Sequence, residues 1–159
     1  MIQRLLEAVS ELQGCTVLPS RGQPFVSREL ALPDDLKAFY ERCGGLRLFE
    51  QSPCPFEILG PDEFEPANLA ILGLGLQQDI SDDWYLLARS GSQQSVSIDL
   101  HPSRLGHCYD SFWDRHAVAG SSTVIALSFS KLLQQTVAFA GRGLYWLEPG
   151  FKDLGDAYD

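Results

Sequence analysis

Three histidines, His101, His107 and His116, are the side chains best suited to acid–base chemistry near neutral pH. His101 lies two residues after Asp99, so both side chains can point to one face of a strand, as a general base and the carboxylate that orients it. This spacing leaves open a small hydrolase built on His101 and Asp99. However, Pro102 predicts that the strand ends there, and the chain has no GxSxG, HExxH or P-loop motif. The sequence therefore favours a protein that is not an enzyme.

Cysteine spacing gives no support for a metal or cofactor site. Cys15, Cys43, Cys54 and Cys108 form no CxxC pair, and no group of cysteines and histidines has the spacing of a zinc site. His107, next to Cys108, is expected to be a strand residue rather than a metal ligand. Four cysteines would allow two disulfides, but without an export signal we expect buried, reduced thiols. No cofactor and no metal are predicted.

The chain is strongly acidic, with a formal net charge of −9 and a pI of about 4.7. A field of this sign repels phosphate backbones and anionic lipids, so neither nucleic acid nor a membrane is an expected partner. It attracts a basic protein. The acidic side chains gather in two stretches, Asp62, Glu63 and Glu65, and Asp79, Asp82 and Asp83. Each stretch is interpreted either as a docking surface for a basic partner or as an ordinary solvated face.

Trp113 is a further candidate for partner contact. It stands beside Phe112 in the least regular part of the chain, residues 110–124, which we expect to be a loop or insertion. An exposed aromatic pair in a loop is typical of a binding hot spot. The alternative is that Trp113 fills one side of the core, as we expect of Trp84, which opens an apolar strand.

The segment 31–49 contains the clearest structural signals. One helical stripe at positions i, i+3, i+4 and i+7 is formed by Leu36, Phe39, Tyr40 and Cys43. Pro33 suits the start of this helix, and Asp34 and Asp35 put negative charge at the positive end of its dipole. Gly44 and Gly45 are expected to end the helix in the left-handed conformation, and a strand should follow.

Other elements are expected on both sides of this segment. An apolar face over residues 2–12 predicts a first helix packed on the core, and Ser128 is a good N-cap for a last helix. A short helix should begin at Pro61, with Asp62 and Glu63 in its first turn, and 66–76 should be a loop with a short strand. Strands are predicted from apolar runs, alternation and turn residues at 15–18, 46–50, 55–59, 84–88, 96–100, 106–109 and 144–147.

Length and composition indicate one domain. A chain of 159 residues, 45% hydrophobic and 21% charged, can build one core but not two comfortable ones. No apolar run approaches the roughly 18 residues of a membrane helix. Glu7 and Glu11 interrupt the first fourteen residues, so these do not read as a signal peptide, and we expect a cytoplasmic location.

The order of these motifs resembles that of the SUKH superfamily, which includes the fungal Smi/Knr cell-wall synthesis regulators and many bacterial immunity proteins. The signature LPDDLKAFY at 32–40 is followed by Cys-Gly-Gly at 43–45, where the family most often has Asn-Gly-Gly. Later matches, in the same order as in the family, are ILGPDEF at 58–64, DWY at 83–85, VSIDL at 96–100, GHCY at 106–109 and SFSKLL at 128–133. The resemblance covers residues 28–139.

This resemblance implies an α+β fold for residues 1–159, with N-terminal helices packed on a curved antiparallel sheet and a late helix. It implies a bacterial immunity protein that binds and neutralises a toxin domain, often a nuclease, without catalysis. The expected partner is a basic toxin, and the expected contacts are the two acidic stretches and Trp113. Two alternatives remain, a regulatory scaffold of the cell-wall-regulator type and the hydrolase using His101 and Asp99.

Overall fold

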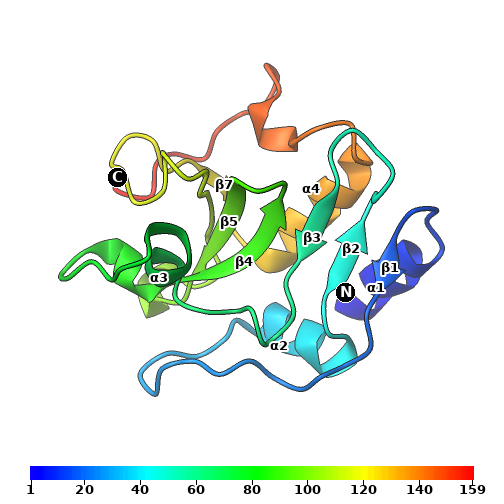
Figure 1. Cartoon of the computed structure of the whole chain (residues 1–159), viewed down its shortest axis with the longest axis horizontal. Helices are drawn as coiled ribbons and strands as arrows, with labels where there is room; N and C mark the ends of the chain where they lie inside the picture. The colour runs from blue at the N-terminus through cyan, green and yellow to red at the C-terminus, as the bar shows by residue number, and fades with distance from the viewer.

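The computed structural model describes residues 1–159 and has an α+β fold, as expected, centred on a seven-stranded antiparallel sheet (Figure 1). The strands follow one another in sequence order, so the whole sheet is a meander with β1 and β7 at its edges. Their bounds are β1 Thr16–Val17, β2 Leu46–Leu48, β3 Phe56–Ile58, β4 Trp84–Ser90, β5 Gln94–Asp99, β6 Cys108–Asp110 and β7 Val124–Ala126.

Four α-helices and three short 3-10 helices complete the fold. Their bounds are α1 Ile2–Ser10, α2 Asp34–Arg42, α3 Ala67–Leu72, α4 Phe129–Phe139, η1 Ile80–Asp83, η2 Pro102–Arg104 and η3 Tyr145–Leu147. The helices α1, α2 and α4 contact one another and share the main hydrophobic core with one face of the sheet. The helix α3 stands apart from them, at the left of Figure 1, and packs on β4. No helix has both the length and the apolar character needed to cross a bilayer.

The predicted apolar stripe of α2 is confirmed, because all four of its side chains are fully buried. The helix begins directly after Pro33, and the carboxylate of Asp35 accepts hydrogen bonds from the backbone amide and hydroxyl of Ser130, at 2.8 and 2.9 Å. An acidic residue of the first turn of α2 therefore also holds the start of α4, since its oxygens satisfy an amide that has no partner within that helix.

The two glycines after α2 have a different role from the one predicted. Cys43, which ends the helix, is extended, and Gly44 is not left-handed. Instead, backbone hydrogen bonds of 2.9 and 3.0 Å join Gly44 and Gly45 to Leu18, which extends the pairing of β1 with β2. A Cβ on Gly45 would lie 2.7 Å from the carbonyl oxygen of Ile58. These glycines allow neighbouring backbones to approach closely.

Most of the other predicted elements are confirmed. The β2–β3 hairpin pairs Leu46 with Ile58, and β4, β5 and β6 form the expected meander. Ser128 caps α4 by accepting a hydrogen bond of 3.1 Å from the amide of Lys131. Alternation predicted β5, whereas β4 was predicted from a short apolar run and is buried on both faces.

Three local predictions were wrong. Residues 61–63 form a turn rather than the start of a helix, and α3 occupies most of the stretch predicted to be a loop with a strand. The loop predicted at 110–124 is confirmed over residues 111–122, and it is followed by the strand β7, which was not predicted. At 144–147 the chain forms η3 instead of a strand, because Tyr145 and Trp146 both point inward, whereas a strand would send them to opposite faces.

Candidate functional site

The second face of the sheet carries a smaller core that combines apolar and polar side chains. Its apolar members are Ala67, Trp84, Tyr109, Val124 and Ala157. They come from α3, three strands and the C-terminal segment, which is joined to Thr123 by an antiparallel bridge at Asp156. Asp99, His101 and the second acidic stretch lie on or beside the elements that make this layer, whereas the first acidic stretch lies around Phe64 of the main core.

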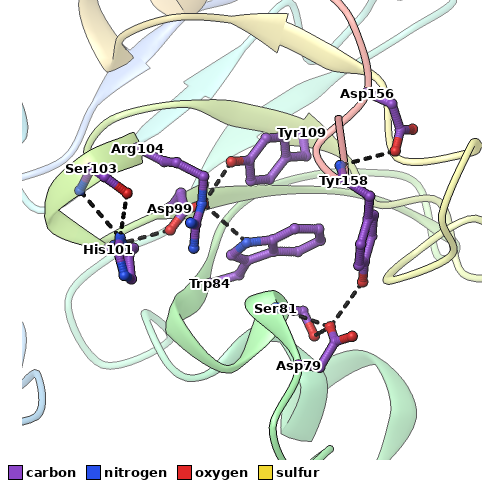
Figure 2. Close-up of polar contacts among 10 residues, drawn as sticks. All are labelled: Asp79, Ser81, Trp84, Asp99, His101, Ser103, Arg104, Tyr109, Asp156 and Tyr158. Carbon is purple, nitrogen blue, oxygen red and sulfur yellow. Dashed lines mark hydrogen bonds and ion pairs between the residues drawn. The ribbon is translucent and has the colours of Figure 1, made fainter.

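Asp99 is fully buried and its carboxylate is used for structure (Figure 2). It accepts hydrogen bonds from Trp84 Nε1 at 3.1 Å, from Tyr109 Oη at 2.6 Å and from Arg104 Nε at 2.8 Å. Burial and the contact with Asp99 raise the pKa of the Tyr109 phenol, so this hydroxyl stays protonated and remains a donor. The carboxylate thereby fixes two aromatic rings of the second core.

His101 does not form the predicted dyad with Asp99. Only the backbone amide of His101 reaches the carboxylate, at 2.9 Å. The ring instead lies 2.8 Å from the hydroxyl of Ser103, and its Nδ1 accepts a hydrogen bond from the Ser103 amide at 3.1 Å (Figure 2). A general base needs its orienting carboxylate within hydrogen-bond reach of the ring. The side chains of His101 and Asp99 therefore lack the arrangement that the hydrolase alternative requires.

A chain of buried hydrogen bonds runs through the second layer and was not foreseen from the sequence. The successive distances are 2.7 Å from Ser97 Oγ to Ser111 Oγ, 2.9 Å from Ser111 Oγ to His116 Nδ1, 2.7 Å from His116 Nε2 to Asn68 Oδ1, and 3.0 Å from Asn68 Nδ2 to Ser81 Oγ. Ser81 Oγ then donates to the carboxylate of Asp79, which also accepts from Tyr158 Oη at 2.8 Å.

The hydrogen-bonding capacity of each group fixes the direction of this chain. The amide oxygen of Asn68 can only accept, so His116 Nε2 carries a proton, and neutral Nδ1 accepts from Ser111. Every donor therefore points along the chain towards Asp79. Burial lowers the pKa of His116 to about 4, which keeps the ring neutral at pH 7 and preserves both hydrogen bonds.

Ser111, His116 and Asn68 have the residue types of a nucleophile, its base and an orienting amide. Ser111 is fully buried, and its hydroxyl is held 2.7 Å from that of Ser97, which is also fully buried. Because Ser111 is fully buried, a substrate cannot contact this oxygen without a rearrangement of the structure. The chain instead joins α3, η1, the loop after β6 and the C-terminal segment to the sheet, so it acts as an anchor for the second layer.

The first acidic stretch follows β3, runs beside the first half of β4 and is partly neutralised. Asp62 forms an ion pair with Arg21, and Glu63 pairs with Arg89 at 3.2 Å. Glu65 is exposed and has no side-chain partner, while its backbone oxygen accepts from Leu86 at 2.8 Å. Within this stretch, Glu65 is the carboxylate with its charge uncompensated.

The second acidic stretch has local structural duties. Burial alone would raise the pKa of Asp79, but hydrogen bonds from Ser81 and Tyr158 outweigh it and lower the pKa. The carboxylate of Asp82 accepts from the amide of Asp79 at 3.2 Å, which completes a capping box at η1. Asp83 is half-buried and Asp82 is exposed. The spacing Asp79-x-x-Asp82 in the sequence could have predicted this cap.

Trp113 is 53% exposed, and it shares a cavity with the ion-pair partner of one of the predicted acidic residues. Trp113 and Arg89 line the same open cavity of about 350 Å³, together with residues of α3, and Arg89 is the ion-pair partner of Glu63. Sequence reasoning did not single out Phe25, which is 88% exposed beside the first acidic stretch. Its exposure could not be read from its apolar type.

The four cysteines are free thiols in the structure. Cys43 and Cys108 are buried, and burial raises the pKa of both thiols. Cys15 and Cys54 are half-buried. No three His, Cys, Asp or Glu side chains gather closely enough to hold a metal ion.

Comparison with known proteins identifies the family. The model of the SMI1 / KNR4 family (SUKH-1) matches residues 28–135, from the segment before α2 to the middle of α4. The chain is 40% identical over 158 residues to the protein named immunity protein YokJ of Bacillus subtilis (strain 168), and the match covers 99% of this chain and 96% of that protein. No solved structure matches. The chain therefore belongs to the SMI1 / KNR4 family (SUKH-1).

Proposed function

We propose that this protein is an immunity protein that neutralises a toxin by binding it directly, without catalysing a reaction. The observation that carries this proposal is the 40% identity, over nearly the whole of both chains, to a protein named as an immunity protein. The proposed site of action is the cytoplasm, where a delivered nuclease would meet its substrate. The absence of a His101–Asp99 side-chain contact is consistent with binding alone.

We further propose that the toxin presents a basic surface. The net charge of −9 would speed association with such a partner and select against acidic ones. Among the predicted contact residues, Glu65 and Trp113 are exposed, and Glu65 has no ion pair or cap to maintain, so these two are the strongest candidates. Asp62, Glu63, Asp82 and Asp83 would add to the field around them, whereas Asp79 is committed to Ser81 and Tyr158.

The test is capture of the partner from an extract of the native cells, first in low salt and then in high salt, followed by purification of the captured protein. We expect one basic toxin whose binding weakens as salt rises, because exposed charge pairs are screened. Bacteria that express the gene of this toxin should then survive when they also express this chain.

Charge reversal supplies the matched comparison. Glu65→Lys should slow association with the captured toxin, whereas Glu11→Lys at the end of α1 should leave the rate closer to that of the parent protein. A partner that is not toxic, or cells that die despite co-expression, would reject the immunity function. An activity lost in both His101→Ala and Asp99→Asn, with the fold of each variant intact, would instead favour the hydrolase.

A further inference from the structure

The loop between β1 and α2 holds an exposed phenylalanine between two anchors. On one side of Phe25, the side-chain amide of Gln23 donates to the carbonyl oxygen of Lys37 at 3.0 Å. On the other side, the amide of Ser27 donates to Tyr85 Oη at 3.3 Å. The ring of Phe25 nevertheless remains 88% exposed, the largest exposed fraction among the large hydrophobic side chains. The fold thus fixes an apolar ring in water, where it gains nothing from burial.

Phe25 forms part of the wall of an open groove of about 500 Å³. The loop around Phe25 makes one wall, and residues 61–66 make the other. The floor contains Phe64 and Tyr85, whose rings are stacked with their centroids 5.1 Å apart. The groove therefore has aromatic surfaces on its floor and at its edge, and both walls are tied to the sheet.

The charge of the groove is negative. Three charged side chains line it, and two of them, Arg21 and Asp62, neutralise each other in an ion pair. The third, Glu65, is exposed and has no side-chain partner. One uncompensated carboxylate thus stands in a groove edged by an exposed aromatic ring. A cation with a flat apolar surface complements both features.

We propose that this groove receives an arginine side chain of the partner protein, with the guanidinium paired to Glu65 and stacked on the ring of Phe25. Arginine fits better than lysine because its planar group can bond a carboxylate and lie on an aromatic face at the same time. The inference rests on the proposed function, and it names the chemistry that the toxin would present at this place. Because the loop is already anchored, binding would cost little ordering of the backbone.

The test uses a defined probe, the peptide acetyl-Gly-Arg-Gly-amide, titrated into the isotopically labelled full chain and followed by NMR. The matched control peptide replaces arginine by citrulline, which has the same shape without the charge. We expect saturable shifts at the amides of Phe25, Glu65 and Tyr85, with binding about tenfold weaker for citrulline, the ratio expected for loss of one charge-assisted hydrogen bond.

Substitutions locate the binding. Phe25→Ala and Glu65→Gln should each weaken binding of the arginine peptide, whereas Glu11→Gln should not. Both groove side chains are exposed, so these variants should keep the parent's spectrum elsewhere. Equal binding of the two peptides, no saturable shift, or unchanged binding by either groove variant would overturn the proposal. Shifts of these amides on raising the protein concentration alone would also overturn it, because they would identify a second copy of the chain as the occupant.

The captured toxin separates this inference from the proposed function. The double variant Phe25→Ala/Glu65→Gln should bind the toxin at least about 30-fold more weakly, as expected for a hot spot. Protection of cells with unchanged affinity in the double variant would keep the immunity function and reject the groove. Arginine-dependent binding in the groove without any protection of cells would keep the groove and reject the immunity function.

Discussion

Acidification should destabilise the protein through His116, whose side chain is only 3% exposed and is hydrogen bonded at both ring nitrogens. Burial lowers its pKa from 6.5 to about 4, so between these values the unfolded chain binds a proton that the folded chain does not. The free energy of unfolding therefore falls as the pH drops through this window, by about 1.4 kcal/mol per unit. The full window corresponds to about 3 kcal/mol, a large share of the stability of an ordinary domain.

The loss of stability on protonation of His116 follows from the direction of the hydrogen-bond chain. A protonated His116 carries a proton on Nδ1 as well, so it can no longer accept from Ser111.

Asp79 contributes to stability in a separate pH window. Its lowered pKa stabilises the fold above the ordinary value of 3.8, and that contribution is lost only as the pH falls through the folded pKa. Measurements above about pH 4.5 therefore report mainly on the histidine.

Urea denaturation between about pH 7.5 and about pH 4.5 tests this reasoning. The variant His116→Gln should be less stable than the parent at the higher pH. The difference in unfolding free energy should shift in favour of the variant by about 2–3 kcal/mol as the pH falls across the range, because glutamine does not titrate there. His107→Gln, at a half-buried histidine outside the chain of hydrogen bonds, is the control and should follow the parent. Parallel pH profiles for the parent and His116→Gln would refute the assignment.

Substitutions at three further places test other contacts. Asp99→Asn should lower the free energy of unfolding by about 2–4 kcal/mol in urea denaturation, since it weakens three side-chain hydrogen bonds to a buried carboxylate. His101→Ala should lower it by less than about 1 kcal/mol. Equal losses in the two variants would contradict the structure. Gly45→Ala should cost about 1–3 kcal/mol by thermal denaturation, because φ is +124° and a backbone oxygen lies 2.7 Å from the new Cβ, while Gly150→Ala, with open space around it, is the control. Ser128→Ala should cost about 1 kcal/mol through loss of the α4 cap, and an unchanged melting temperature would show that the cap is dispensable.

The elements predicted most clearly from the sequence are those long enough to display a helical or strand period. Four apolar side chains at helical spacing marked α2, and alternation over residues 96–100 marked β5. The helix α3 was missed because it has six residues, too few to display a helical period, and because Gly73 and Gly75 suggested a loop. The strand β7 was missed for a similar reason, since it has three apolar residues with no alternation.

The polar layer could not be predicted from the sequence, because its contacts join residues far apart in the chain. Asn68 and His116 are 48 residues apart, and nothing near either one indicates the other. The capping box at η1 is local and its spacing was visible, yet the same aspartates were interpreted by charge alone. A cluster of carboxylates supports a docking surface only after the side chains committed to caps and ion pairs have been set aside.

Loops held at a few points explain how one fold can present an adaptable surface. On one face of the sheet, α1, α2 and α4 close the large apolar core, and the loop that carries Phe25 is joined to this side by the hydrogen bond of Ser27 to Tyr85. On the other face, loops are held by hydrogen bonds such as that of Asn68 to His116. Because each loop is fixed at a few points, the side chains between those points can change without disturbing the core. Phe25 and Trp113 occupy such positions, so specificity for a partner can be set there at little cost to folding.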